Sequence, residues 1–209
     1  MFRKSHRKHI KEVTMNFNKD GKEYTNDWFD HQLRYFSSNL QEFKGRDVKF
    51  LEVGSWEGRS TCWMLDNILT SKESSITCID SWQGGWEHSE HDMAEVERKF
   101  LSNTSENSDK VEVVKALSKQ GLILIQDRVE HYDFIYIDAG HTMLDVMTDG
   151  ILAIDLLKPG GIMAFDDYGW GRDNPKHLIP QIGIDALVMA LHEKVEVIAT
   201  GYQIWIRKK

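Results

Sequence analysis

The sequence lacks a disulfide framework, a membrane-length apolar run and an excess of positive charge. Its two cysteines, Cys62 and Cys78, stand in apolar segments without metal-ligand spacing, which predicts buried thiols in a reducing cytoplasm. No apolar stretch approaches the ~20 residues that a membrane-spanning helix needs. The net charge of −7 disfavours a nucleic-acid-binding surface. We therefore expect a cytoplasmic protein that binds neither nucleic acid nor a membrane.

What is present suits a single domain, because 41% of the 209 residues are hydrophobic. The basic start, MFRKSHRKHIK, lacks the apolar block of a secretory signal, and we expect residues 1–25 to form a flexible arm. Residues 26–209 then form one domain that begins with a helix.

The leading helix is predicted over residues 26–43 by apolar residues at alternating steps of four and three. These are Phe29, Leu33, Phe36, Leu40 and Phe43. Asn26 would cap the helix. We expect the stripe to pack on the main body; the alternative is that it joins two copies in a homo-oligomer.

From residue 48 onward, short apolar segments alternate with helical ones. Strands are expected at 48–53, 75–80, 110–116, 132–140 and 162–169, with helices over 58–69, 117–129 and the segment ending at 155. This alternation predicts a parallel sheet with helices on both faces. Residues 194–199 and 202–208 form a hairpin, so the sheet ends in an antiparallel edge strand. The fold class is α/β, a Rossmann-like doubly wound sheet, mostly parallel with an antiparallel last strand.

The stretch LEVGSWEGRST, residues 51–61, places Gly54 and Gly58 where the first expected strand turns into its helix. Glycines there leave no side chain between the backbone and a ligand. A nucleoside triphosphate site is excluded because the stretch lacks the GxxxxGK[ST] spacing. A dinucleotide is disfavoured because Trp56 replaces the middle glycine of GxGxxG. S-adenosylmethionine, which has no phosphate, remains.

Cofactor contacts are also expected at the next two strand ends. Asp80 ends the second strand, where a carboxylate can accept hydrogen bonds from both ribose hydroxyls. Trp82 could cover the adenine ring. Ser118 follows the third strand, where an adenine edge would lie.

Three carboxylates are expected at neighbouring strand ends: Asp138 in IDAGH, and Asp166 and Asp167 in FDDYGW. Clustered anions repel one another, and oxygen ligands suit a hard divalent ion, with Mg²⁺ as the first choice. Asp166 and Asp167 can both face such an ion only if the strand has already begun to turn. His141, three residues after Asp138, is a candidate general base at the pocket mouth.

With these residues, the chain resembles the class I S-adenosylmethionine-dependent methyltransferases. More narrowly, it resembles the metal-dependent O-methyltransferases of the catechol and macrolide-sugar types, over about residues 48–208. The pattern ExGxxxGxS, present as Glu52, Gly54, Gly58 and Ser60, carries the resemblance together with Asp80. Histidine at 141 sides with the macrolide-sugar type, because the catechol type has lysine there.

The resemblance implies that residues 26–209 are a single methyltransferase domain and assigns a set of site residues. The implied cofactor contacts are Glu52, Gly54, Ser55, Gly58, Ser60, Asp80, Ser81, Trp82, Ser118 and Asp138. The implied metal ligands are Asp138, Asp166 and Asp167, and the catalytic residues are His141 and Asp138. The metal would bind the acceptor hydroxyl, His141 would take its proton, and the alkoxide would attack the sulfonium methyl group.

The acceptor is expected to be a small molecule with a sugar, polyol or ring hydroxyl. Four aromatic residues are candidate pocket walls: Trp82, Trp86, Tyr168 and Trp170. The alternatives are a metal-independent N- or C-methyltransferase, an NAD(P)-dependent oxidoreductase and a non-catalytic cofactor-binding protein. Dependence on a divalent ion separates O-methylation from N-methylation.

Overall fold

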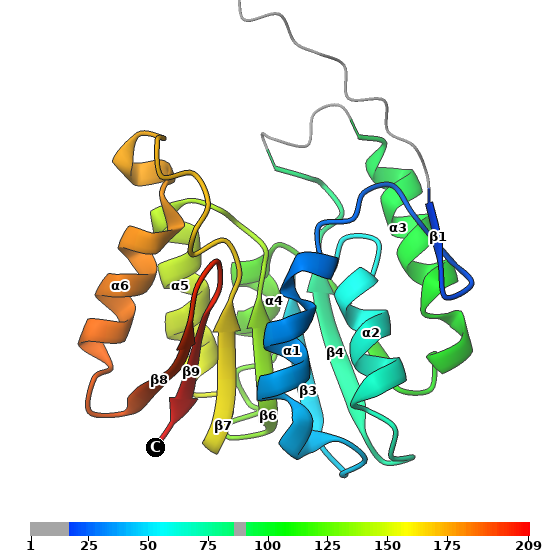
Figure 1. Cartoon of the computed structure of the whole chain (residues 1–209), viewed down its shortest axis with the longest axis horizontal. Helices are drawn as coiled ribbons and strands as arrows, with labels where there is room; N and C mark the ends of the chain where they lie inside the picture. Colours follow the sequence, from blue (N-terminus) through cyan, green and yellow to red (C-terminus); the bar gives the residue numbers. More distant parts are fainter. Residues whose placement is uncertain (1–16, 86–90) are drawn as a thin grey trace, which may run out of the picture.

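The computed structural model describes residues 17–85 and 91–209, whose main feature is a seven-stranded sheet (Figure 1). The strands lie in the order β5-β4-β3-β6-β7-β9-β8. Their bounds are Lys49–Val53 for β3, Ser75–Asp80 for β4, Val111–Lys115 for β5, Tyr132–Ile137 for β6, Leu157–Phe165 for β7, Val195–Thr200 for β8 and Ile204–Lys208 for β9. Only β9 runs against its neighbours, so the predicted α/β fold with an antiparallel last strand is confirmed.

Helices cover both faces of the sheet, as the alternating pattern predicted. One face carries α1 (Leu33–Asn39), α2 (Arg59–Asn67) and α3 (Met93–Asn103). The other carries α4 (Ser118–Leu124), α5 (Met143–Ile154) and α6 (Pro180–Ala190). Each layer buries its own apolar cluster against the strands, which accounts for strands that are apolar on both sides. The described part of the chain also contains the short 3-10 helices η1 (Asp30–Gln32), η2 (Gln41–Phe43), η4 (Ser105–Asn107) and η5 (Lys176–Leu178).

The leading apolar stripe packs on the sheet through α1 and its flanking 3-10 turns. Phe36 is fully buried and meets Tyr136 and Trp205 edge-to-face, at ring centroid distances of 5.1 and 5.2 Å. Burying such a side chain contributes about 1.5–3 kcal/mol. The predicted Asn26 cap is wrong: the Asp27 carboxylate accepts the Asp30 amide instead, because the helical turns begin later than the sequence suggested.

Residues 17–24, inside the segment expected to be a flexible arm, form a two-stranded hairpin. Its strands are β1 (Phe17–Lys19) and β2 (Lys22–Tyr24). The hairpin is held on the domain because Tyr24 is only 1% exposed and lies under the Arg59 guanidinium, 5.5 Å from the ring centre. The arm boundary at 25 therefore differs from the structure, and the rest of the predicted arm, residues 1–16, lies outside the described residues.

The end of the sheet differs from the prediction in two ways. The antiparallel β9 is not an edge strand: it lies between β7 and β8, and the edge strand β8 runs parallel to β7. In addition, β7 spans 157–165 rather than 162–169, so the strand already includes Lys158–Gly161 and ends before Asp166. Both aspartates therefore stand in the turn after the strand.

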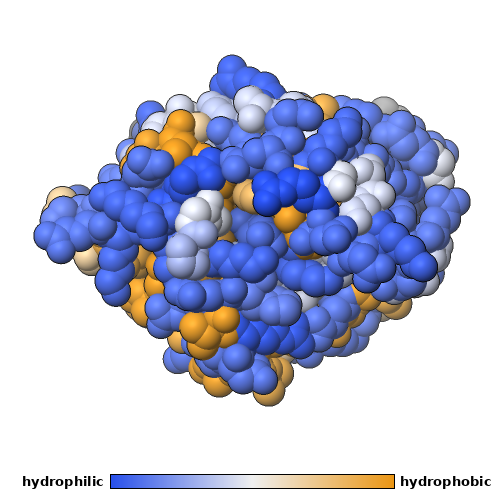
Figure 2. Space-filling model, turned by 90° about the horizontal axis from the view of Figure 1, so that it is seen from below, coloured by the Kyte–Doolittle hydropathy of each residue, from blue (hydrophilic) through white to orange (hydrophobic). Residues whose placement is uncertain are grey.

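The parallel strands end at the top of the molecule in Figure 1, where the loops predicted to hold functional residues gather. The opposite face is mostly hydrophilic, with separate apolar patches (Figure 2). Within residues 17–85 and 91–209, no helix has the length and apolar composition needed to cross a membrane. In a sheet of this topology, ligands bind at the carboxyl ends of the strands.

Candidate active site

Gly54 brings two strand ends into direct contact at this edge of the sheet. Its φ is +89°, and a Cβ atom added there would lie 2.0 Å from the Asp138 carbonyl oxygen. Alongside, the Asp138 amide donates to the Val53 carbonyl at 2.7 Å. Only glycine fits this approach, so the first glycine of the motif packs the end of β3 against the end of β6. The glycine turn and the predicted metal ligand Asp138 are thereby in direct backbone contact.

Asp80 lies where it was predicted, at the end of β4, and organises the glycine turn. Its Oδ2 accepts the backbone N–H groups of Ser55 at 2.8 Å and Trp56 at 3.0 Å, and its Oδ1 accepts that of Trp82 at 2.8 Å. A bound ribose would have to share this carboxylate with the turn. Trp56 and Trp82 have φ values of +50° and +46°, so the carboxylate stabilises two strained residues.

Glu52 is fully buried beneath the turn, and its contacts explain its place in the motif. The hydroxyls of Ser60, at 2.5 Å, and of Thr61 both donate to its carboxylate. Burial raises the pKa of Glu52 above its usual value. Glu52 and Ser60 therefore hold the start of α2 against β3, and each carboxylate oxygen of Glu52 accepts one of these hydroxyls.

The residues predicted on the adenine side separate into two groups. Ser81 lines an open depression of about 670 Å³ together with Leu117 and Gln120, which suits a flat base. Trp82 does not cover it, because its indole is 5% exposed and packs on Phe100. The Ser118 hydroxyl is hydrogen-bonded to Asp149 on α5 and does not line the depression.

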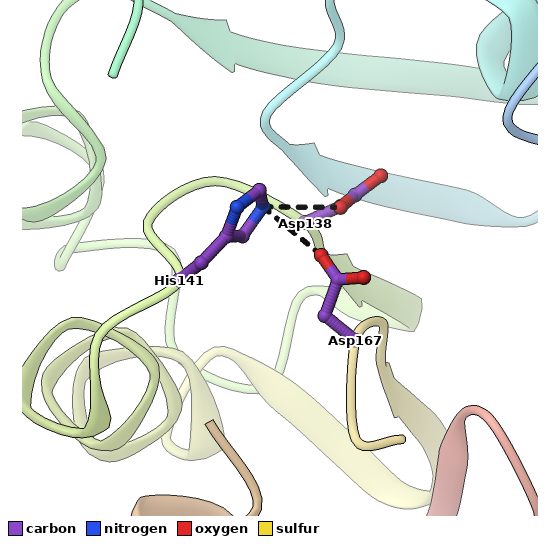
Figure 3. A group of neighbouring side chains, drawn as sticks. All are labelled: Asp138, His141 and Asp167. Carbon is purple, nitrogen blue, oxygen red and sulfur yellow. Dashed lines mark ion pairs between the residues drawn. The ribbon is translucent and has the colours of Figure 1, made fainter. Parts of the chain in front are cut away.

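Asp138, His141 and Asp167 gather at the carboxyl end of the sheet (Figure 3). One ligand atom from each lies within 4.8 Å of the others. His141 Nε2 is 3.0 Å from Asp167 Oδ2 and 4.0 Å from Asp138 Oδ1. Asp138 and His141 lie in the loop between β6 and α5, and Asp167 follows β7, so two loops supply the group.

Asp166 does not join this group, because the chain turns sharply after β7. Asp167 has a φ of +54° and faces His141. Asp166 instead accepts from Gln203 at 3.0 Å and from Gln32 at 3.4 Å. Both aspartates were expected to face one metal ion if the chain turned after the strand. The chain does turn there, but Asp166 and Asp167 contact different residues.

The carboxylates of Asp138, Asp166 and Asp167 nevertheless repel one another electrostatically. Burial has the largest effect on Asp138, and the negative charges of Asp166 and Asp167 add to it; together they raise the pKa of Asp138 well above its usual range. Burial and Asp167 raise the pKa of Asp166 to about 7. A donor set of two carboxylates and an imidazole with this uncompensated charge fits a hard divalent cation.

Two further residues at the site were not singled out from the sequence. The Tyr202 hydroxyl donates to Asp167 Oδ1 at 2.9 Å, which leaves Oδ2 directed at His141. Gln203, fully buried, holds Asp166. Both come from the segment between β8 and β9, and only knowledge that β9 pairs beside β7 would have pointed to them. Of the predicted aromatic walls, Trp170 lies 5.5 Å from the His141 ring, and Trp86 lies outside the described residues.

A family model described as a methyltransferase domain matches residues 51–168, which include the glycine turn, Asp80 and the group of Asp138, His141 and Asp167. The chain belongs to this methyltransferase family. The predicted enzyme class, a class I S-adenosylmethionine-dependent methyltransferase, is thereby confirmed. No curated protein matches the chain.

Solved structures share the fold of this methyltransferase at low identity. An O-methyltransferase from Bacillus cereus in complex with SAH (S-adenosylhomocysteine) is 20% identical, with a TM-score of 0.65 over 89% of this chain and 84% of that one. The MycE methyltransferase of mycinamycin biosynthesis, in complex with Mg, SAH and mycinamycin VI, is 16% identical, with a TM-score of 0.58 over 85% of this chain and 48% of that one. The fibrillarin pre-rRNA processing protein of Methanococcus jannaschii is 14% identical, with a TM-score of 0.54 over 79% and 67%. These likenesses establish the fold alone.

Proposed function

We propose that this methyltransferase transfers the methyl group of S-adenosylmethionine to a hydroxyl oxygen of a small molecule, with a divalent metal ion, Mg²⁺, at the acceptor site. The observation that carries the proposal is the group of Asp138, His141 and Asp167 beside the Gly54 turn. A metal-independent enzyme has no need for clustered carboxylates at the reaction centre. The Mg and SAH in the structure of MycE support the same assignment.

The cofactor would lie across the carboxyl ends of β3 and β4. The turn at Gly54, with Ser55 and Gly58, would hold the methionine portion, because it stands at the carboxyl end of β3 beside Asp138. Asp80 would accept the ribose hydroxyls. The depression beside Ser81 would take the adenine. Glu52 and Ser60 support the turn from below.

Asp138 and Asp167 would hold the metal ion, with Asp166 as a neighbouring charge that faces Gln203. When bound, the cation supplies positive charge that lowers the pKa of a coordinated hydroxyl. The Tyr202 hydroxyl holds Asp167 Oδ1, and Oδ2 faces His141. Clustered anionic charge is thus placed where a cation and an acceptor hydroxyl would meet.

His141 would accept the proton of the acceptor hydroxyl as general base. Its Nε2 lies 3.0 Å from Asp167 Oδ2, and this contact fixes the ring orientation and stabilises the imidazolium that forms. The acceptor oxygen then attacks the methyl carbon of the sulfonium, and S-adenosylhomocysteine leaves. Most of the acceleration would come from holding the two reactants in line.

Trp170 offers a flat apolar face beside His141 on which a ring or sugar could lie. We therefore propose a small acceptor that carries a sugar, polyol or ring hydroxyl. Cys62 and Cys78 are free, buried thiols, which supports the cytoplasm as the proposed compartment.

The test is methyl transfer by the full chain to a panel of sugars, polyols and phenols, with Mg²⁺ or with EDTA. Activity should require the metal and should fall strongly in Asp167→Asn, whereas Asp173→Asn, an exposed acid in the following loop, should behave as wild type. Full activity in EDTA would contradict the metal-dependent mechanism. Transfer to amines but not to hydroxyls would favour the N-methyltransferase.

A further inference from the structure

The cofactor turn, residues 54–58, contains a strained backbone conformation that contacts with the surrounding residues must stabilise. Glu57 stands between Trp56 and Gly58, whose φ values are +50° and +79°. A positive φ at a tryptophan is sterically unfavourable and persists only where surrounding contacts enforce it. The Asp80 carboxylate holds this turn on one side through the Ser55 and Trp56 amides. The contacts of Glu57 hold it on the other.

The Glu57 side chain points away from the cofactor side, into a buried polar cluster. Its Oε2 accepts the Thr25 amide at 2.6 Å, and its Oε1 accepts the Thr25 hydroxyl at 2.5 Å. Lys99 on α3 completes the cluster, with its Nζ 3.2 Å from Glu57 Oε1 and 2.7 Å from the Thr25 hydroxyl oxygen. The side chains of Glu57 and Lys99 are 1% and 3% exposed.

The backbone of Glu57 is held by α3, which is itself bonded to the N-terminal hairpin. The Asn103 side chain donates to the Glu57 carbonyl and to the Glu23 carbonyl, each at 2.9 Å. In return, the Glu23 amide donates to Asn103 Oδ1 at 3.0 Å. The Asn103 amide group therefore joins β2 to the cofactor turn and is 5% exposed as a residue.

We propose that Glu57, through Lys99 and Thr25, is a positioning residue for S-adenosylmethionine, and that residues 17–25 are a working part of the cofactor site. Thr25, directly after the hairpin, acts on the turn conformation through the buried Glu57 carboxylate. This inference rests on the proposed binding of the cofactor at the Gly54 turn.

A purely structural role for the cluster makes a different prediction. Buried ion pairs often add little net stability, but removal of one partner leaves an uncompensated charge. If Glu57 served stability alone, its replacement would lower the melting temperature and leave cofactor affinity unchanged in the folded fraction. If it positions the turn, affinity falls in protein that is still folded.

The experiment measures SAH binding by calorimetry on the full chain at a temperature where each variant is folded. We expect Glu57→Gln to weaken binding by about tenfold or more, equivalent to about 1.4 kcal/mol. Thr25→Val, outside the turn, should weaken binding in the same direction. The matched control is Leu187→Ala, a buried site on α6 at the opposite face, which should lower the melting temperature while SAH affinity stays at the wild-type value.

Hydrogen exchange supplies a second readout, because the Ser55 and Trp56 amides should exchange faster in Glu57→Gln than in Leu187→Ala. Wild-type SAH affinity in both Glu57→Gln and Thr25→Val would overturn the inference and leave the proposed function standing. If wild-type protein itself failed to bind SAH, the proposed function would fail, and the inference with it.

Discussion

Asp149 offers a prediction of pH-dependent stability that is independent of catalysis. It lies on α5 with 1% of its surface exposed, and it faces the start of α4, where Ser118 hydrogen-bonds to it. Its Oδ2 has no hydrogen-bond partner among the residues that the structure describes. Burial raises the pKa of Asp149 from 3.8 to about 7, and the charge of Asp145 adds to this. Asp149→Asn replaces the titrating group with a neutral one of the same shape.

The magnitude follows from the two pKa values. The folded protein binds this proton more tightly than the unfolded chain does, so the contribution to stability is fully present below about pH 3.8 and is lost as the pH rises through about 7. A pKa difference of about 3 corresponds to about 4 kcal/mol in total. About 2.5 kcal/mol of that loss falls between pH 5 and pH 8.

The assay is urea denaturation of wild type and Asp149→Asn at pH 5 and pH 8, with unfolding monitored by circular dichroism. Relative to wild type, the free energy of unfolding of the variant should rise by about 2.5 kcal/mol between the two pH values. Asp127→Asn, an exposed carboxyl after α4, should show no such change. Parallel pH profiles for wild type and Asp149→Asn would refute the reasoning.

Three further outcomes are expected. Gly54→Ala should abolish SAH binding in calorimetry, because its Cβ would lie 2.0 Å from the Asp138 carbonyl oxygen; retained affinity would show that the turn can move. Tyr202→Phe should weaken Mg²⁺ binding about fivefold, the effect of one lost hydrogen bond, and an unchanged metal titration would exclude a role for Tyr202 in orienting Asp167. His141→Asn should lower the rate of methyl transfer by about 10²–10⁴-fold with SAH affinity retained; a rate near wild type would exclude it as the base.

The sequence predicted the sheet well because its strands are buried on both faces and therefore read as continuous apolar runs. The expected 75–80 coincides with β4, and 132–140 contains β6. The hairpin at 17–24 was not predicted, because its two strands have three residues each and are mostly polar. The position of β9 inside the sheet was not predicted either, since the sequence pattern of a hairpin does not show which of its two strands pairs with the rest of the sheet.

Within the site, the sequence located the strand ends but not the directions of the side chains. Asp138 and His141 meet as expected, because Asp138 lies at a strand end and His141 only three residues later. Asp166 and Asp167 diverge, since one positive φ at Asp167 decides the outcome and no residue pattern announces it. The direction of Trp82 was equally unpredictable, because a tryptophan after a strand can turn either to the pocket or, as here, to Phe100 in the core.

The insertion of β9 between β7 and β8 has a consequence for how the domain assembles. β8 precedes β9 in the chain but borders only β9, so it cannot join the sheet until β9 has paired with β7. Tyr202 and Gln203, which hold Asp167 and Asp166, arrive in the same step. Before that step, β7 is an open edge that can pair with another chain. Closure of the sheet beyond β7 and completion of the acidic site therefore depend on the same strand pairing, that of β7 with β9.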